Sequence, residues 1–241
     1  MKINQIKHCF VILWSVVCSN TVFAITLDLT GINSSDVKSH LKPVTEIITA
    51  GQTPPILFLN YHTGPYMGTV ISFYSLAMTD FKSVNSGYPT LWFALSVSPN
   101  LTIGANIAGV SWLDDNIQTI GPFISTMWGT PQKSVNSTVH FHNLKGPDDF
   151  HLTDVAFDIS RIITTNTWTY GYGLTAHYLN TKIHVTDNPD SSQNYNSTIN
   201  INNIFLRFGI YRRIGNSFDI GSEFFLNSGN IIGNLNLALN F

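Results

Sequence analysis

The last eleven residues, Ile231-Ile232-Gly233-Asn234-Leu235-Asn236-Leu237-Ala238-Leu239-Asn240-Phe241, indicate the fold class. They alternate between a polar face and an apolar face, and the apolar face consists of Leu235, Leu237, Leu239 and Phe241. This period of two is typical of a strand with one greasy and one polar side. In a soluble protein such a strand exposes an edge that invites aggregation, whereas a closed membrane barrel removes the edge and places the greasy side in lipid. The stretch therefore predicts a membrane β-barrel.

The first 24 residues are typical of a secretory signal peptide. Lys2 and Lys7 precede an apolar run over 9–18, and Val22-Phe23-Ala24 supplies the residues for cleavage after Ala24. A membrane anchor needs about 20 apolar residues, and this run is too short. We therefore expect an exported mature chain that begins at residue 25.

Composition excludes several classes of protein. Cys9 and Cys18 both lie in the predicted signal peptide, so disulfides are excluded from the mature chain. Without Lys2 and Lys7, 10 basic residues remain against 14 acidic ones, and no basic patch indicates a nucleic-acid partner. Charged residues make up only 11% of the chain, below the roughly 25% of soluble domains. No segment after residue 24 has 18 consecutive apolar residues, which argues against membrane helices.

Alternating segments recur along the chain. The segments 91–97 and 101–107 flank the turn Ser98-Pro99-Asn100 and predict a hairpin. Further strands are predicted over 117–128 and 135–141, although isoleucines on both faces leave the facing of 117–128 open.

A strand over 168–178 carries rings on one face. Its predicted outward face consists of Trp168, Tyr170, Tyr172, Leu174, Ala176 and Tyr178. Amphipathic rings clustered at one end fit the aromatic girdle of a membrane barrel, although cross-strand aromatic pairing in a soluble sheet is an alternative.

The predicted connections differ in length at the two ends of the barrel. The segment 187–200 lacks periodicity and is predicted to be a long loop, whereas the turns near Asn100, Asn166 and Asn216 are short. Counting strands back from Phe241 places the short turns in the periplasm and the long loop outside, the asymmetry expected of outer-membrane barrels.

The strand count depends on the N-terminal third. Ten strands are reached at 68–79, and strands over 44–50 and 56–61 would make twelve, the number we expect. A short periplasmic helix over 36–50, interrupted by Pro43, is the alternative. The predicted organisation is a signal peptide at 1–24, an N-terminal periplasmic segment or first strand at 25–55, and an all-β, antiparallel up-and-down barrel at 56–241.

The signal peptide, the alternating strands and the terminal Phe241 together resemble bacterial outer-membrane β-barrel proteins. In these proteins the barrel assembly machinery reads a last strand that ends in an aromatic residue, here Leu237, Leu239 and Phe241. Their signal commonly has glycine where this chain has Asn236. The segment 50–61 also resembles the N-terminal part of the phenol meta-pathway family of outer-membrane transporters.

The inward faces of the predicted strands supply candidate lumen residues. These residues are Asp154, Asp158, His177, Arg207, Asp219 and Glu223. Arg207 and Glu223 lie roughly opposite each other across the last long hairpin, so we expect an ion pair. It is either a structural bridge that plugs the lumen or a charged constriction that tunes permeation.

Three histidines form a candidate metal site. His140 and His142 point the same way on one strand, and the loop over 143–150 is expected to bring His151 beside them. Asp148, Asp149 and Asp154 are close enough in sequence to complete a set of nitrogen and oxygen ligands. A polar strand face near a loop is the alternative.

An enzyme is not expected. Ser137 shares a strand with His140 and His142 but alternates onto the opposite face, so it cannot form a nucleophile–base pair with them. Gly171-Tyr172-Gly173 lies inside a strand rather than in a nucleotide loop, and its glycines would sit inward, where they relieve crowding or leave space for a solute.

The sequence therefore predicts an outer-membrane barrel that passes small, apolar or aromatic solutes and has no cofactor. Its expected partners are outer-membrane lipid, the assembly machinery and a small-molecule solute. The alternative is a structural or adhesive barrel with a plugged lumen that acts through its external loops. A soluble periplasmic β-sandwich is the third hypothesis.

Overall fold

The computed structural model describes residues 34–56, 64–74, 88–112, 115–145, 150–185, 194–215 and 217–241. The predicted signal peptide lies outside these residues, as do residues 57–61 of the second predicted N-terminal strand.

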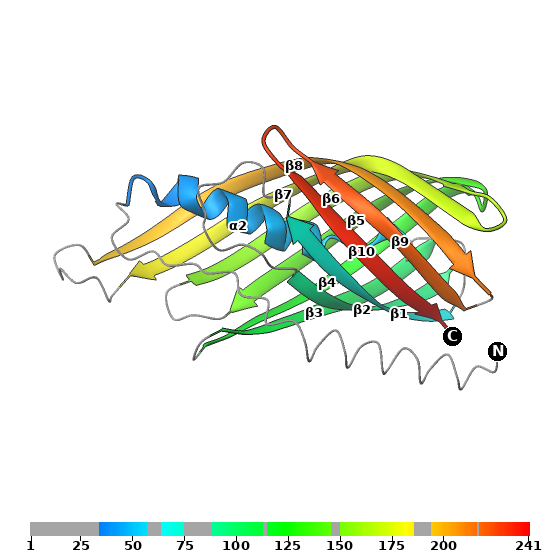
Figure 1. The fold of residues 1–241 in the computed structure, drawn as a ribbon, viewed down its shortest axis with the longest axis horizontal. Coiled ribbons are helices and arrows are strands. Elements are labelled where there is room, and N and C mark those ends of the chain that lie inside the picture. Colours follow the sequence, from blue (N-terminus) through cyan, green and yellow to red (C-terminus); the bar gives the residue numbers. More distant parts are fainter. Residues whose placement is uncertain are drawn as a thin grey trace.

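Ten strands of the described chain form one closed antiparallel barrel, in which the first strand also pairs with the last (Figure 1). The strands are β1 Gly64–Tyr74, β2 Tyr88–Ser98, β3 Leu101–Trp112, β4 Asp115–Thr130, β5 Lys133–Lys145, β6 Phe150–Thr164, β7 Trp168–Val185, β8 Tyr195–Ile214, β9 Phe218–Leu226 and β10 Ile231–Asn240. Because β1 pairs with β10 from Tyr66↔Asn240 to Tyr74↔Ile232, the terminal strand has no free edge. The barrel confirms the predicted fold class, and the predicted count of twelve strands is wrong.

The connections near Phe241 are short. They are residues 99–100, 131–132, 165–167 and 215–217. The amide of Asn240 donates to the carbonyl of Ser217 at 2.9 Å, and that of Phe241 to the carbonyl of Pro65 at 3.2 Å. The three short turns that the sequence predicted therefore lie at one end, which we call the turn end.

The opposite end, here the loop end, carries the connections 75–87, 113–114, 146–149, 186–194 and 227–230. The predicted loop over 187–200 is too long, because β8 already begins at Tyr195. The start of this strand is rich in polar residues, so its sequence lacks the alternation of apolar and polar residues that indicates a strand.

Side chains alternate between wall and lumen as the period of two requires. On β7 all six predicted outward residues are exposed, and His177 on the other face is buried. On β4 the ambiguity is resolved: Ile120, Ile124 and Trp128 point outward, whereas Phe123 and Met127 are buried inside.

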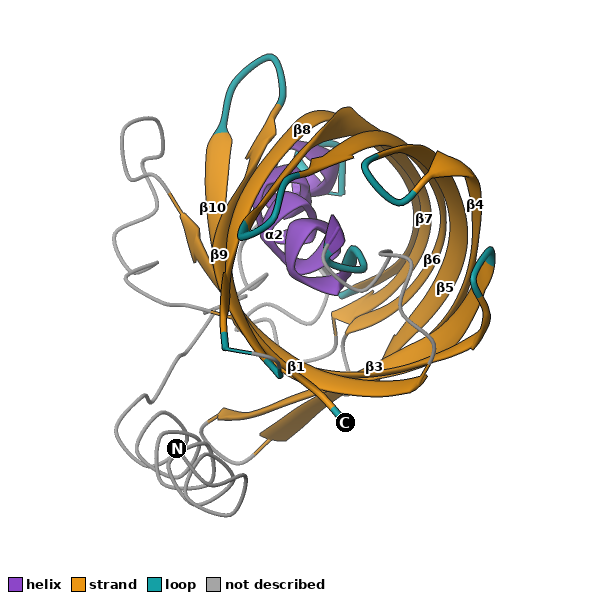
Figure 2. Ribbon diagram, turned by 90° about the vertical axis from the view of Figure 1, so that its right-hand side faces the viewer, coloured by secondary structure: helices purple, strands orange, loops and turns teal. Residues whose placement is uncertain are grey.

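One helix, α2 Val37–Gln52, lies inside the barrel (Figure 2). It begins at the loop end, where Val37 and Leu41 pack in a cluster with Leu144, Phe150 and Ile183 from the wall. The helix runs toward the turn end. Ile56, four residues after its last residue, packs there in a second cluster with residues of the wall. Within the described residues, no helix is long and apolar enough to cross a bilayer.

The helix forms despite Pro43 in its interior. Proline in a helix costs about 3 kcal/mol relative to alanine. Burying one large aliphatic side chain returns roughly 1.5–3 kcal/mol, and α2 buries Val37, Leu41, Val44 and Ile47 almost completely. Packing inside the barrel therefore outweighs the local propensity.

The helix corrects the prediction for the N-terminal region. The predicted strand over 44–50 is wrong, and the helix over 36–50 that stood as its alternative is present. It lies in the lumen rather than forming a separate N-terminal segment (Figure 2). Below, residues 37–56 are called the plug.

Candidate functional site in the barrel lumen

The six residues predicted to face the lumen are all buried: Asp154, Asp158, His177, Arg207, Asp219 and Glu223. They come from β6, β7, β8 and β9, whose alternation turns them inward. Asp219 lies toward the turn end and pairs with Arg213 at 3.1 Å, apart from the others. The remaining five meet the plug or lie beside residues that do.

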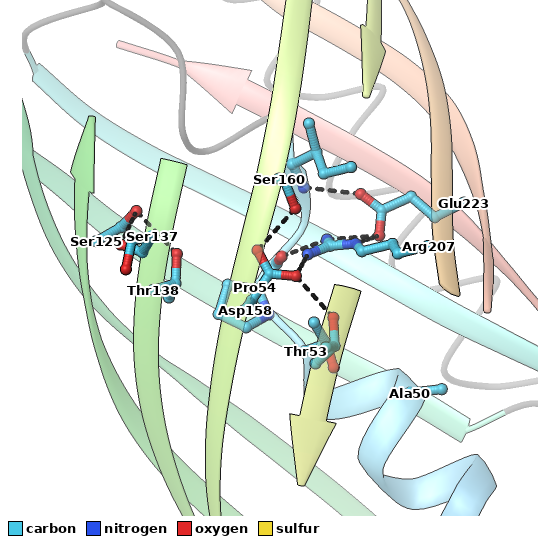
Figure 3. A network of polar contacts seen from close by, with 12 residues as sticks. Ala50, Thr53, Pro54, Ser125, Ser137, Thr138, Asp158, Ser160, Arg207 and Glu223 are labelled. Atoms are coloured by element: carbon cyan, nitrogen blue, oxygen red, sulfur yellow. Dashed lines mark hydrogen bonds and ion pairs between the residues drawn. The ribbon is translucent and has the colours of Figure 1, made fainter. Parts of the chain in front are cut away.

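Arg207 is the centre of a charged network (Figure 3). Its Nη2 lies 2.7 Å from Glu223 Oε2, and its Nη1 lies 3.2 Å from Asp158 Oδ2. The contact with Glu223 agrees with the predicted ion pair, although the register places Glu223 opposite Gly209, two residues along β8.

The network also binds the backbone of the plug. Arg207 Nη2 donates to the carbonyl of Pro54, and the amide of Ile56 donates to Glu223 Oε1 at 2.7 Å. Tyr211 donates its hydroxyl to the same carboxylate oxygen. We call this arrangement of Arg207, Asp158 and Glu223 around the plug the latch.

The second carboxylate of the latch is held by hydroxyls. Asp158 accepts from Thr175 at 2.7 Å and from Ser160 at 2.8 Å, in addition to Arg207. Buried charges are tolerated only when they are paired and hydrogen-bonded. Wall residues meet this requirement for Asp158, whereas Arg207 and Glu223 also use backbone groups of the plug.

Two wall glycines make room for the end of the plug. A Cβ on Gly171 would lie 2.6 Å from Cδ1 of Ile56, and one on Gly209 would lie 3.2 Å from the same atom. The inward glycine that the sequence indicated in Gly171-Tyr172-Gly173 therefore leaves space for Ile56.

Asparagines of the wall and of the connection 227–230 contact the helix nearer the loop end. Asn234 on β10 donates to the carbonyl of Ala50 at 2.9 Å, and Asn230 donates to Glu46. Asn203 on β8 lies 3.5 Å from the hydroxyls of Thr45 and Thr49. Alternation along the terminal strand indicated that Asn234 lies on its polar face, but it did not indicate that Ala50 of the plug is the partner of Asn234.

A histidine cluster lies beside the latch. His142 Nδ1 is 3.4 Å from His140 Nδ1 and 3.3 Å from Asp154 Oδ2, and His177 Nδ1 is 2.8 Å from the same carboxylate oxygen. All four residues are buried. His151 does not join them, because β6 already begins at Phe150 and alternation turns His151 to the exposed outer face. Of the other predicted ligands, Asp148 and Asp149 lie outside the described residues.

In the predicted assembly signal, Leu237 and Leu239 of β10 are buried in a cluster with Met67, Phe218 and Ile220. Phe241 follows the strand and is 55% exposed. Recognition by the assembly machinery stays a prediction.

The sequence matches no protein-family model and no curated protein. Among solved structures, the translocator domain of the autotransporter NalP from Neisseria meningitidis is similar, with a TM-score of 0.51 and 11% identity over 87% of this chain and 99% of that chain. The KdgM porin in complex with oligogalacturonate has a TM-score of 0.40 and 8% identity, over 73% of this chain and 99% of that chain.

Ail of Yersinia pestis has a TM-score of 0.35 and 11% identity, over 74% of this chain and 98% of that chain. Of these three similarities, the one with NalP supports a shared barrel fold. The resemblance to bacterial outer-membrane β-barrels is thus confirmed as a fold, and the resemblance of residues 50–61 to the phenol meta-pathway transporters stays a prediction.

Proposed function

We propose that this chain is an outer-membrane barrel whose lumen is closed by its own plug and which acts at its loop end. The observation that carries the proposal is the plug itself, held in the lumen by the latch. A helix with large buried side chains occupies the space that a solute would need. The plugged, structural or adhesive barrel is therefore better supported than an open channel.

An apolar band around the wall supports placement in a membrane. On β7 it runs from Trp168 to Tyr178, ten residue steps or about 33 Å of strand. At a strand tilt of roughly 40° this gives a band about 25 Å tall, the height found in outer-membrane barrels.

Between the apolar band and the loop end, the polarity of the outward and inward faces of the wall is reversed. There the outward side chains are polar and form cross-strand pairs, Asn180 with Asn200 and His184 with Asn196, each at 2.9 Å. The inward ones, such as Leu179 and Ile183, are apolar and pack with the plug. This part of the wall, residues 143–145, 150–153, 179–185 and 195–203, is called the extension, and its polarity is that of a structure in water.

The orientation follows from the connections. Outer-membrane barrels have short periplasmic turns and longer external loops, which assigns the turn end to the periplasm. The extension and the loop end then lie outside the cell. Because α2 begins at the loop end, Ser34–Asp36 emerge there too (Figure 1). The barrel would thus present Ser34–Asp36, the extension and the connection 227–230 to the surroundings.

A second candidate is a channel that conducts when the plug withdraws. The polar and charged inner wall favours it, because a water-filled lumen needs such a lining once the helix is gone. Of the predicted passage for small solutes, this gated channel is the version that is compatible with a plugged lumen. A catalytic role is not proposed.

Cysteine labelling in intact bacteria tests the proposal. We expect Ser35→Cys to react with a membrane-impermeant maleimide on whole cells, because Ser35 is exposed at the loop end. The matched variant Gln132→Cys, exposed at the turn end, should react only after the outer membrane is permeabilised. The reverse pattern, or recovery of the protein in the soluble periplasmic fraction, would contradict the proposal.

A further inference from the structure

Three donor atoms converge in the histidine cluster. A ring nitrogen of His140, a ring nitrogen of His142 and one oxygen of Asp154 lie within 4.8 Å of one another. His142 Nδ1 lies 3.4 Å from His140 Nδ1 and 3.3 Å from Asp154 Oδ2. Ligands about 2.0–2.1 Å from a tetrahedral zinc lie roughly 3.3–3.4 Å apart. The two separations at His142 Nδ1 therefore match those between neighbouring ligands of a zinc ion.

The surroundings of the cluster carry an excess of negative charge. Within the described residues the buried carboxylates include Asp154, Asp158 and Glu223, and the buried guanidinium of Arg207 is shared by the last two. Asp154 contacts only histidines, and its Oδ1 has no hydrogen-bond partner within the described residues. A divalent cation at the three donors would compensate this charge.

Neighbouring residues support the orientation of the ligands. His177 Nδ1 lies 2.8 Å from Asp154 and its Nε2 lies 3.2 Å from the hydroxyl of Thr53, so a donor from the wall and a residue of the plug brace the carboxylate. Such outer contacts orient ligands in metal sites. Gly121 leaves the space for His142, because a Cβ there would lie 1.8 Å from its ring.

We propose that His140, His142 and Asp154 bind a divalent transition metal of the zinc type, with His177 as a positioning residue. Two imidazoles and a carboxylate form a donor set that suits zinc. The site lies where the end of the plug meets the wall, so the bound metal would also strengthen the attachment of the plug through His177 and Thr53. The inference is independent of the proposed function, since it rests on the cluster alone.

Metal content tests this site. The full barrel is refolded in detergent with zinc, passed over a desalting column and analysed by elemental mass spectrometry. We expect about one zinc per wild-type barrel and almost none in His142→Gln or Asp154→Asn. The first variant removes an imidazole ligand, and the second removes a carboxylate ligand. The control His151→Gln, which changes an exposed histidine of β6, should retain as much zinc as the wild type.

Cobalt provides a readout that does not depend on variants. Refolding of the wild-type barrel with Co(II) should give the intense visible bands of tetrahedral coordination, lost when zinc is added.

Thr53→Val should weaken zinc retention by about 10-fold or more, since it removes an outer contact. A wild-type barrel that retains no metal, or equal retention by wild type, His142→Gln and Asp154→Asn in folded form, would overturn the proposal.

Discussion

Single side chains at the latch stabilise both wall and plug. Arg207 carries the one buried guanidinium within the described residues, and it neutralises two carboxylates while donating to a plug carbonyl. Removing one partner of a buried ion pair strands the other charge, which costs more than the pair contributes. We therefore expect a single substitution at the latch to have a large effect on stability.

Arg207→Ala should lower the free energy of unfolding by about 3–5 kcal/mol, because it leaves Asp158 and Glu223 without their cation. The control Arg212→Ala removes an exposed arginine that lies over Trp168 at 5.4 Å, and should cost roughly 1 kcal/mol or less. Urea unfolding in detergent, followed by tryptophan fluorescence, measures both. Equal losses would show that the latch contributes nothing specific.

The space beside Ile56 allows a second prediction. Gly171→Val should destabilise the barrel by about 1–3 kcal/mol, since the new side chain occupies the position of Ile56. Adding Ile56→Ala should recover part of this loss, because the smaller plug residue leaves room for valine. Gly229→Val, where a Cβ meets nothing within 4 Å, is the control. The two substitutions would be independent, against our expectation, if their effects on stability simply add.

Residue facing could be predicted from the sequence because alternation is a local property. It placed Asp154, Asp158 and His177 inside and Tyr172 outside without knowledge of any partner. The sequence named His140, His142 and Asp154 among several candidate ligands, but it could not show which third residue joins the two histidines, because that depends on register. Asp154 faces His142 only through the pairing of β5 with β6, and a start of β6 one residue away would have turned His151 inward instead.

At the scale of elements, the plug is the feature that the sequence predicted wrongly: a strand was expected over 44–50, and the helix stood only as the alternative. Pro43 argues locally against a helix, and the aliphatic residues around it suit a buried strand or a buried helix equally well. The choice is made by the barrel, whose inner wall offers a cluster of apolar residues at the loop end. Tertiary packing therefore determines an element that propensity does not.

The extension explains why the loop predicted over 187–200 was too long. Its outward residues on β8 are polar because they lie above the apolar band, so the start of the strand at Tyr195 resembles a loop in sequence. A search for alternation of apolar with polar residues fails where one face is polar and the other is only partly apolar. The strand continues because β7 pairs with it over its whole length, from Val185↔Tyr195 to Trp168↔Arg212.

The whole molecule combines a membrane wall with a lumen that is filled by its own chain. The polarity reversal in the extension and the longer connections lie at the same end, which the proposed orientation places outside the cell. The plug begins at that end and is held inside the barrel by the latch. These features are the basis of the proposed closed barrel that acts at its loop end.

Conductance in planar bilayers tests the closed lumen most directly. The purified wild-type barrel should be silent, whereas a variant lacking residues 37–52 should conduct, because deletion of α2 empties the lumen while the ten strands remain. Heat-modifiable migration in detergent gels confirms that both proteins are folded before they are compared. A wild-type barrel that conducts as strongly as the deletion variant would contradict a lumen closed by the plug.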